Sequence, residues 1–499
     1  MTRSTNITKI ILSTILFVYF IFAIQPWNLY FLNDDFVHIP LSAKTQWIHF
    51  QFFRPVANLL TAAEVKLFGT NSLGFHITSL LLHIFSTFCV SILCNQLIYK
   101  YGDQAQYKNA GFVAGCLFFI YPFHSEPLMW IIGRISMIAT LFIIISIIFF
   151  LKRSQHSFYY LLSLLSFVIG LFSYEITWVV PGLVSVITLV EYLKLQKRIK
   201  KEILYLLPFW ILFGIFLLLR HMVLRQLITE YEVLGRDMSV FSLVANFFRL
   251  LARTMVPPTQ NTIEFIVIFS ATIFVLLGFI LFIAKRRAVK LLHVLLVLFL
   301  IISYLPTIAI GIDTHGSEGE RYLYFPSVFW ILLLTMLIYE LSGKIGTYVF
   351  FLIAAAYSLL LATSALNYQH ASHVAKNILS VFNNRPAFKK IIAINIPANY
   401  RGAMIFRSGF AEAIDWMYPH MNVDTIIVVP AKRTYEKISL PVKIIKKEDL
   451  TAHYIKASTS DNKNYTLYFK NRIIEYNSTQ DLLIFFNETG VGEVLYPHP

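Results

Sequence analysis

The sequence has 499 residues, of which 57% are hydrophobic and 14% are charged. Soluble domains carry about 25% charged residues, so this composition excludes an ordinary soluble protein and indicates an integral membrane protein. The formal net charge of +15 would suggest nucleic-acid binding in a soluble chain. Here many basic residues lie in short segments between apolar runs, as in the cytoplasmic loops of membrane proteins, and we therefore expect no nucleic-acid partner.

Apolar stretches of about 20 residues are long enough to cross a bilayer as helices, and this sequence predicts about eleven of them. The third is short, and the fifth and sixth share a break, so the number depends on how these three are divided. The stretches lie near residues 8–25, 72–98, 110–122, 132–151, 158–173, 176–193, 203–222, 263–284, 291–310, 322–342 and 346–366.

The basic residues between these stretches predict which side each loop faces. Arg3 and Lys9 precede the first stretch, which we interpret as a retained helix, and a basic segment follows every even-numbered stretch. By the positive-inside rule, the N-terminus is cytoplasmic, and an odd number of spans places residues 367–499 outside the plasma or inner membrane. The segments predicted outside are residues 26–71, 123–131, the break at 174–175, 223–262, 311–321 and the C-terminal tail.

The composition of the chain changes near Arg385. Short β-like runs near residues 391–396, 425–429, 465–469 and 482–486 alternate with polar turns, and residues 402–417 predict a helix. We therefore expect a membrane domain over residues 1–370 and an extracytoplasmic domain over residues 385–499. The predicted fold class is an all-α polytopic membrane domain with a small C-terminal α/β domain.

Ionisable side chains gather in the segments predicted outside. Such groups are costly in or near a bilayer, and they commonly mark functional sites in membrane proteins. They come from four separate segments of the chain, which favours one composite site on the outer face. The set comprises Asp34, Asp35, His38, Arg54, His124, Glu126, Glu175, Glu320 and Arg321.

The first outer loop carries an acidic pair, Asp34 and Asp35, directly after the first apolar stretch. A carboxylate near the lipid surface suits a general base, which needs hydrogen-bond reach to the attacking group. A helix N-cap is the alternative role for such an Asp. Further along, Arg54 suits phosphate binding or an interfacial anchor, and residues 56–67 form an amphipathic stretch that we expect to lie in the membrane interface.

The other outer loops carry His124 and Glu126 in one turn, Glu175 in a break between apolar runs, and Glu320 before Arg321. Arg134 enters the next helix after the turn and needs an anionic partner, for which Glu126 and a lipid phosphate are the alternatives. Glu320 and Arg321 either pair with other loops or, for Arg321, bind phosphate.

Two further interpretations stay open for the outer-face residues. Tyr324, after Arg321, is either a site residue or a member of an interfacial aromatic belt. A divalent cation is an alternative partner for the carboxylates and imidazoles, although no spacing is diagnostic of a metal. The ligands in that case would come from Asp34, Asp35, His38, His124 and Glu126.

Taken in chain order, these motifs resemble those of the C-type (GT-C) membrane glycosyltransferases. Protein O-mannosyltransferase-like enzymes, including those with tetratricopeptide repeats, are the most similar members, and the resemblance covers about residues 8–366. The motifs are the acidic pair, Arg54-Pro55-Val56, the segment 68–76, Pro-x-His-Ser-Glu…Trp-Ile-x-Gly-Arg at 122–134, and Glu-Arg-Tyr-Leu-Tyr-x-Pro-Ser at 320–327.

The resemblance implies an inverting transfer of a sugar from a polyprenyl-phosphate donor to an acceptor hydroxyl on the outer face. It implies that Asp34 is the catalytic base with Asp35 beside it, and that Arg134 and Arg321 lie near the donor phosphate, where Arg54 is a further candidate. The tail shows neither a 34-residue tetratricopeptide period nor a lectin-type insert. The acceptor therefore stays open between a protein, a lipid-linked glycan and a cell-wall polymer.

Two other function classes compete with the transferase. A transporter or flippase of a lipid-linked glycan would carry paired repeats and polar residues near the midplane of the membrane, and neither is found in the sequence. A membrane scaffold that displays the tail would not need so many ionisable residues at the ends of its helices.

Overall fold

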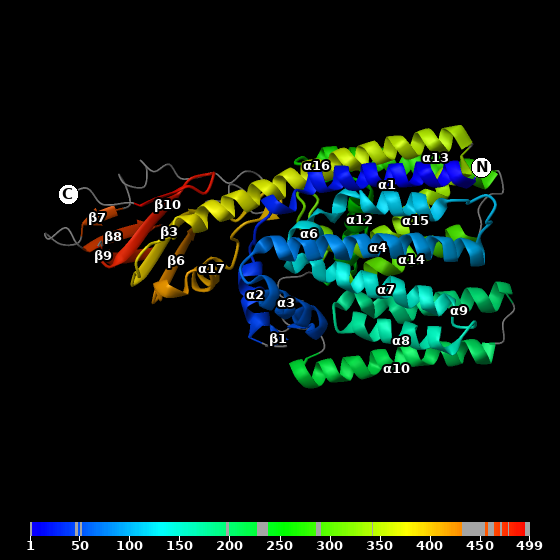
Figure 1. The fold of residues 1–499 in the computed structure, drawn as a ribbon, viewed down its shortest axis with the longest axis horizontal. Coiled ribbons are helices and arrows are strands. Elements are labelled where there is room, and N and C mark those ends of the chain that lie inside the picture. Colours follow the sequence, from blue (N-terminus) through cyan, green and yellow to red (C-terminus); the bar gives the residue numbers. More distant parts are fainter. Residues whose placement is uncertain are drawn as a thin grey trace.

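The computed structural model describes residues 2–44, 48–49, 52–195, 199–226, 238–285, 291–341, 343–431, 455–457, 464–469, 472–477 and 479–494. Figure 1 shows long helices that run side by side, with a strand-rich C-terminal region beyond one end of the bundle. The bundle helices are α1 (Thr2–Ile24), α4 (Ser72–Tyr101), α5 (Ala110–Phe119), α7 (Ile135–Leu151), α8 (Ser157–Leu171), α9 (Val180–Leu195), α10 (Ile199–Leu224), α13 (Thr262–Lys285), α14 (Leu291–Tyr304), α15 (Tyr324–Glu340) and α16 (Gly343–Ser380).

The predicted polytopic all-α domain is confirmed. Within the described ranges, six helices are long and apolar enough to cross a membrane, and five further apolar helices are shorter. Each falls on one of the predicted apolar stretches, because a run of apolar residues in lipid must satisfy its backbone hydrogen bonds internally as a helix. In the apolar stretch that contains α7, 78% of the residues are buried, whereas in that of α1 only 11% are buried. Helix α7 therefore lies inside the bundle, and α1 faces the surroundings.

Small residues allow close helix contacts inside the bundle, as is common between membrane helices. At Gly115 of α5, an added Cβ would lie 2.2 Å from the Ser91 hydroxyl of α4. The C-terminal end of α4 contributes to a buried ionic cluster at the end of the bundle that holds the chain's N-terminus. There, Arg153 pairs with Glu191 at 2.6 Å and with Glu202, and Lys100 also pairs with Glu191.

The first loop after α1 contains η1 (Pro26–Asn28), α2 (Asp35–Ala43), β1 (Ile48–His49), β2 (Phe52–Phe53) and α3 (Pro55–Phe68). In α3, Leu59 and Leu67 are 58% and 74% exposed, whereas Thr61 and Glu64 are buried. The apolar face of α3 therefore points outward, as suits the interfacial helix expected over residues 56–67.

A second amphipathic helix, α12 (Val240–Met255), lies in the segment 223–262 that the sequence suggested as a loop. Its exposed face carries Phe241, Val244 and Phe248, and the polar residues Asn246 and Arg253 are buried on its opposite face. The apolar residues of α12 recur every three or four positions on one side only, so it lacks the continuous apolar run by which the spans were found. Residues 227–237 of this segment lie outside the described residues.

The long helix α16 has 38 residues, which at 1.5 Å per residue amounts to about 57 Å. Figure 1 shows it running beside α1 and continuing past the bundle to the strands. The adjoining sheet has the order β11-β10-β3-β6, in which β3 (Lys390–Ile396) is parallel to β6 (Thr425–Pro430) and β10 (Asp481–Phe486), and β11 (Gly492–Val494) is antiparallel to β10. A second sheet joins β7 (Ile455–Ala457), β8 (Asn464–Phe469) and β9 (Arg472–Asn477). The expected small α/β region after the bundle is confirmed.

The helix expected over residues 402–417 is shorter than the sequence suggested. A two-stranded ladder of β4 (Asn399–Tyr400) and β5 (Ala403–Met404) comes first, and α17 (Phe410–Met417) begins only after Gly409. Both Gly402 (φ +93°) and Gly409 (φ +83°) adopt a left-handed backbone conformation, which interrupts a right-handed helix.

Candidate active site

The loops named from the sequence meet at the end of the bundle that adjoins the C-terminal region. The Trp130 indole N–H donates to the Leu32 carbonyl at 3.1 Å, and the backbone N–H of Asn33 donates to the Ile405 carbonyl at 2.8 Å. Arg54 pairs with Glu175, and Arg321 pairs with Glu126. The structure therefore brings four of the loops that the sequence predicts outside, together with the C-terminal region, to one place.

Asp35, the first residue of α2, is buried and holds two loops together. Its Oδ2 accepts the Leu32 amide N–H, and its Oδ1 accepts the Ile132 amide N–H of the second loop, both at 2.9 Å. Burial raises the pKa of the Asp35 carboxyl to about 7, against the two backbone N–H groups and the Arg134 charge, which favour the charged form. Both oxygens already have backbone partners, so this carboxyl acts as a connection between loops.

Asp34 differs from Asp35 because its carboxylate is partly exposed. It occupies the N-cap position of α2, but its side chain makes no capping hydrogen bond. Its Oδ1 accepts a hydrogen bond from the hydroxyl of Ser408, in the C-terminal region. Within the described part of the chain, no lysine, arginine or histidine lies within ion-pair distance of Asp34. A carboxylate that faces a hydroxyl without a bound cation has the arrangement that a general base needs.

Arg134 lies in η3 (Ile132–Arg134), and its partner is Glu64 of α3, not Glu126. Its Nη1 donates to Glu64 Oε1 at 2.8 Å and to the Phe75 carbonyl at 3.2 Å, and its Nη2 donates to Glu64 and to the Thr61 hydroxyl. Arg134 is 1% exposed and Glu64 is 3% exposed. Of the two alternatives left open for Arg134, the pairing with Glu126 is wrong, because α3 folds over the start of α7 and presents Glu64 there.

Glu126, in α6 (Ser125–Met129), pairs with Arg321 of η6 (Glu320–Tyr322). Glu126 Oε2 also accepts the Arg321 backbone N–H at 2.7 Å, and burial raises the pKa of Glu126 against the charge of Arg321. The Arg321 guanidinium lies over the Trp130 ring at 5.3 Å, and its side chain is still 19% exposed. Arg321 is thus anchored by a carboxylate and reaches the surface.

Glu320 points the other way, into the protein, where Arg253 of α12 pairs with it at 2.7 Å and Ser125 donates a hydroxyl hydrogen bond. Burial raises the pKa of Glu320 to about 7, although Arg253 favours the carboxylate. The two adjacent residues Glu320 and Arg321 therefore pair with different elements, as the alternative of pairing between loops anticipated.

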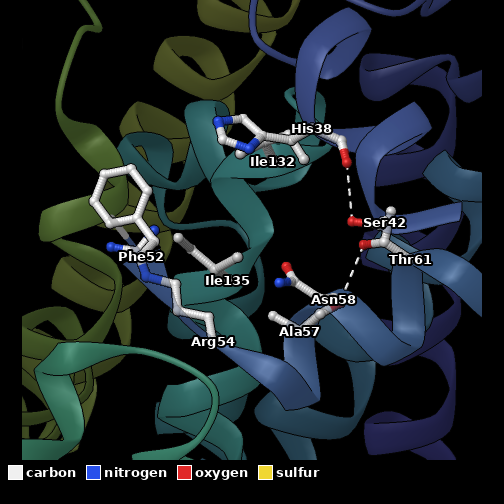
Figure 2. Close-up of a pocket in the computed structure, with 9 residues that line it drawn as sticks. All are labelled: His38, Ser42, Phe52, Arg54, Ala57, Asn58, Thr61, Ile132 and Ile135. Carbon is white, nitrogen blue, oxygen red and sulfur yellow. Dashed lines mark hydrogen bonds between the residues drawn. The ribbon is translucent and has the colours of Figure 1, made fainter. Parts of the chain in front are cut away.

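Arg54 and Glu175 meet beside a small cavity of about 40 Å³ under α2. The Arg54 Nε donates to Glu175 Oε2 at 3.0 Å, and Arg220 of α10 donates to Glu175 Oε1 at 2.9 Å. Figure 2 shows Arg54 and Phe52 on one side of this cavity, with His38 on another. The lining residues are His38, Ser42, Phe52, Arg54, Ala57, Asn58, Thr61, Ile132 and Ile135.

His124 and Tyr324 lie deeper, in a buried layer of rings. The His124 Nε2 is 2.8 Å from the Ser327 hydroxyl, and the Tyr324 hydroxyl is 2.8 Å from Nδ1 of His83. The His124 and Tyr324 rings are 4.3 Å apart. Burial, together with the neighbouring His83, lowers the pKa of His124 well below its usual range, so this imidazole is neutral.

The residues considered for a divalent cation are held by separate partners. Glu126 is paired with Arg321, His124 contacts Ser327, and Asp35 accepts backbone N–H groups. Among the described residues, no group of three or more His, Cys, Asp or Glu side chains has the arrangement of a metal site.

The sequence interpretation missed several residues of this site. Glu64 sits in an amphipathic stretch, where a carboxylate on the less apolar face was a signal that could have been used. Arg253 lies in the helix that the sequence did not reveal. Ser408 carries no local signal, because it is 374 positions from its contact Asp34. The same holds for Arg407, which pairs with Glu318, 89 positions away.

The curated proteins most informative for comparison are protein O-mannosyl-transferases. The chain is 28% identical over 107 residues to the protein O-mannosyl-transferase F38B6.6 of Caenorhabditis elegans, which covers 21% of this chain and 14% of that protein. It is 29% identical over 96 residues to protein O-mannosyl-transferase TMTC1 of Homo sapiens, which covers 19% of this chain and 10% of that protein. The chain is similar to membrane glycosyltransferases. These matches confirm the resemblance drawn from the motifs, while no protein-family model matches the chain.

The solved structures to which the chain is similar include ArnT from Cupriavidus metallidurans bound to undecaprenyl phosphate. The TM-score is 0.45 and the identity 11%, over 84% of this chain and 89% of that chain. The oligosaccharyltransferase of Archaeoglobus fulgidus tethered to an acceptor peptide has a TM-score of 0.46 and 10% identity, over 84% of this chain and 64% of that chain. The curated relatives are much longer than the matched parts, since the matches span only 10% to 14% of their length.

Proposed function

We propose that this protein is a membrane glycosyltransferase that moves a sugar from a polyprenyl-phosphate donor to an acceptor hydroxyl. The observation that carries the proposal is the environment of Asp34, a partly exposed carboxylate at the end of the bundle that accepts a hydrogen bond from a hydroxyl. The similarity to protein O-mannosyl-transferases supports the same reaction class and favours mannose as the sugar to test first.

In the proposed reaction, the acceptor hydroxyl attacks the anomeric carbon from the side opposite the phosphate. The new O–C bond forms while Asp34 takes the hydroxyl proton. The bond between the anomeric carbon and the phosphate oxygen breaks, and the polyprenyl phosphate leaves with that electron pair. A single displacement of this kind inverts the anomeric configuration, and a positioned base contributes about 10²- to 10⁴-fold to such a step.

Asp35 acts in this proposal as a positioning residue. Its two oxygens hold the Leu32 and Ile132 amides, which fixes the start of α2 and therefore the place of Asp34. Because those oxygens are buried and occupied, the proton of the acceptor is assigned to Asp34 alone.

The leaving phosphate needs positive charge, and the surface-reaching arginines can supply it. The side chains of Arg321 and Arg54 are 19% and 17% exposed. That of Arg407, which pairs with Glu318 and is influenced by the charge of Asp34, is 43% exposed. Arg134 is enclosed with Glu64, so we assign it to holding α3 against α7. We propose Arg321, Arg54 and Arg407 as the phosphate-binding set.

The remaining expected residues frame the site. Glu126 and Glu175 anchor Arg321 and Arg54, Glu320 ties α12 to the last loop, and His38 lines the cavity under α2. We propose that this end faces outside and that the N-terminus is cytoplasmic, because the basic loops lie at the other end. The division into a membrane domain over 1–370 and an outer domain over 385–499 belongs to the same proposal.

The test is Asp34→Asn in purified full-length protein, with undecaprenyl-phosphate mannose as the donor probe and release of undecaprenyl phosphate as the readout. Asn keeps the shape but cannot take the proton, so we expect a loss of about 10²- to 10⁴-fold in turnover. The matched control is Asp103→Asn, at the exposed turn on the opposite end, which should leave turnover unchanged.

Unchanged turnover in Asp34→Asn would show that Asp34 is not the catalytic base. Transport of a lipid-linked glycan across vesicle membranes by the wild type, without any donor turnover, would favour the transporter in place of the transferase.

A further inference from the structure

The segment 402–409 of the C-terminal region is seated directly on the loops of the candidate active site. At Gly409, an added Cβ would lie 2.5 Å from the Asn33 carbonyl oxygen, and at Gly402 it would lie 2.2 Å from the Ser317 amide nitrogen. Between these two contacts, the Ile405 carbonyl accepts the Asn33 amide N–H at 2.8 Å. The backbone of the segment is therefore fixed against the loop that carries Asp34.

This seating brings the Ser408 side chain to Asp34. Ser408 and Asp34 are both open to solvent, in contrast to Asn33, which is 0% exposed. The Asn33 Oδ1 accepts the Ser408 amide N–H at 2.9 Å and lies 3.1 Å from the Ser408 hydroxyl. The Ser408 hydroxyl has one proton and two acceptors within reach, Asp34 Oδ1 and Asn33 Oδ1.

We propose that the Ser408 hydroxyl is a placeholder for the acceptor hydroxyl: it occupies Asp34 in the resting enzyme and rotates onto Asn33 when an acceptor arrives. This inference rests on the proposed function of Asp34. A serine hydroxyl that donates to the proposed base reproduces the hydrogen bond that an acceptor hydroxyl must make before its proton is taken. Rotation about one side-chain bond releases Asp34 without any movement of the segment, because Asn33 already holds the Ser408 backbone.

The placeholder has a kinetic consequence. An acceptor must displace the Ser408 hydroxyl. Removing that hydroxyl should therefore strengthen acceptor binding by the net free energy of one hydrogen bond. We expect a fall in the KM of the acceptor of about three- to tenfold in Ser408→Ala, with kcat within about twofold of wild type because the base is untouched. With no acceptor added, water reaches Asp34 more often, and donor hydrolysis should rise by a similar factor.

The experiment uses full-length wild type, Ser408→Ala and Ser408→Thr with undecaprenyl-phosphate mannose and a short serine-containing peptide as the acceptor probe. Release of undecaprenyl phosphate is measured against peptide concentration, including zero peptide. Lower KM or faster hydrolysis in Ser408→Ala, with wild-type behaviour in Ser408→Thr, supports the placeholder because threonine retains the hydroxyl.

The inference would be overturned by each of the following results in the Ser408 experiments. An unchanged KM and unchanged hydrolysis in Ser408→Ala, or a lower kcat together with a lower melting temperature, would show that Ser408 has only a structural role. A hexose found on Ser408 by intact-protein mass spectrometry would make it an acceptor itself. Release that Asp34→Asn does not reduce would instead overturn the proposed function, and this arm is read independently of the Ser408 variants.

Discussion

The buried pair of Arg134 and Glu64 gives a prediction that separates a structural arginine from a phosphate-binding one. Glu64→Gln removes the negative charge and one of the two oxygens that Arg134 uses, and leaves a guanidinium that is 1% exposed. The remaining bonds to Phe75 and Thr61 do not neutralise it. Breaking a buried ion pair on one side costs about 3–5 kcal/mol, so we expect a large loss of thermal stability.

The assay is thermal denaturation of detergent-purified protein, followed by the loss of the folded peak in size-exclusion chromatography. The matched control is Glu318→Gln, which breaks the pair with Arg407, where the two side chains are 43% and 41% exposed. A surface pair of this kind contributes about 0–1 kcal/mol. The melting temperature should therefore fall several times further in Glu64→Gln than in Glu318→Gln.

The double variant Glu64→Leu with Arg134→Met completes the design. Replacing both buried charges with apolar side chains is often neutral or stabilising, so this variant should recover much of the stability that Glu64→Gln loses. Its KM for undecaprenyl-phosphate mannose should stay near that of wild type. Equal melting temperatures in Glu64→Gln and Glu318→Gln, or a stable double variant with a strongly raised donor KM, would refute the structural role and return Arg134 to the donor phosphate.

Two further predictions concern Asp35 and Gly409. Burial holds the pKa of Asp35 near 7, above its ordinary value of 3.8, so the folded state keeps a proton that the unfolded state releases, and this contribution to stability is lost as pH rises from about 4 to about 7. The melting temperature of wild type should therefore fall relative to that of Asp35→Asn over that range, and a relative rise would contradict the assignment. Gly409→Ala places a Cβ against Asn33 in a left-handed conformation, at a cost of about 1–3 kcal/mol, and should lower donor turnover and expose the segment 402–409 to protease. Gly214→Ala, where nothing lies within 4 Å, is its control and should change neither.

The sequence predicted the membrane architecture well because lipid imposes a simple rule on it. A chain segment in hydrocarbon must satisfy its own backbone, so apolar length alone locates helices such as α4 and α16. The same rule says nothing about α12, whose apolar residues cover one face only. Nor could the sequence show that the helix expected over 402–417 begins only after residue 409. The left-handed conformations of Gly402 and Gly409 accompany close contacts with Ser317 and Asn33, which are distant in the sequence.

The sequence predicted many of the residues that gather at the candidate site, but not which of them form ion pairs. Costly ionisable groups gather in the loops that the sequence predicts outside, so Asp34, Arg54 and Arg321 could be named from the sequence. Which cation meets which carboxylate depends on how distant helices pack, and no local pattern encodes it. Arg134 pairs with a residue 70 positions away and Arg321 with one 195 positions away.

The pairings also distinguish the acidic residues that sequence alone treated alike. Glu126, Glu175 and Glu320 each pair with an arginine, so an acceptor hydroxyl would have to displace that arginine to reach the carboxylate. Asp35 is occupied by two backbone N–H groups. Asp34 faces a hydroxyl that has a second acceptor available, so its carboxylate can be released at the cost of one bond rotation. Among the acidic residues named from the sequence, Asp34 is therefore the one whose surroundings both position a carboxylate and leave it able to take a proton.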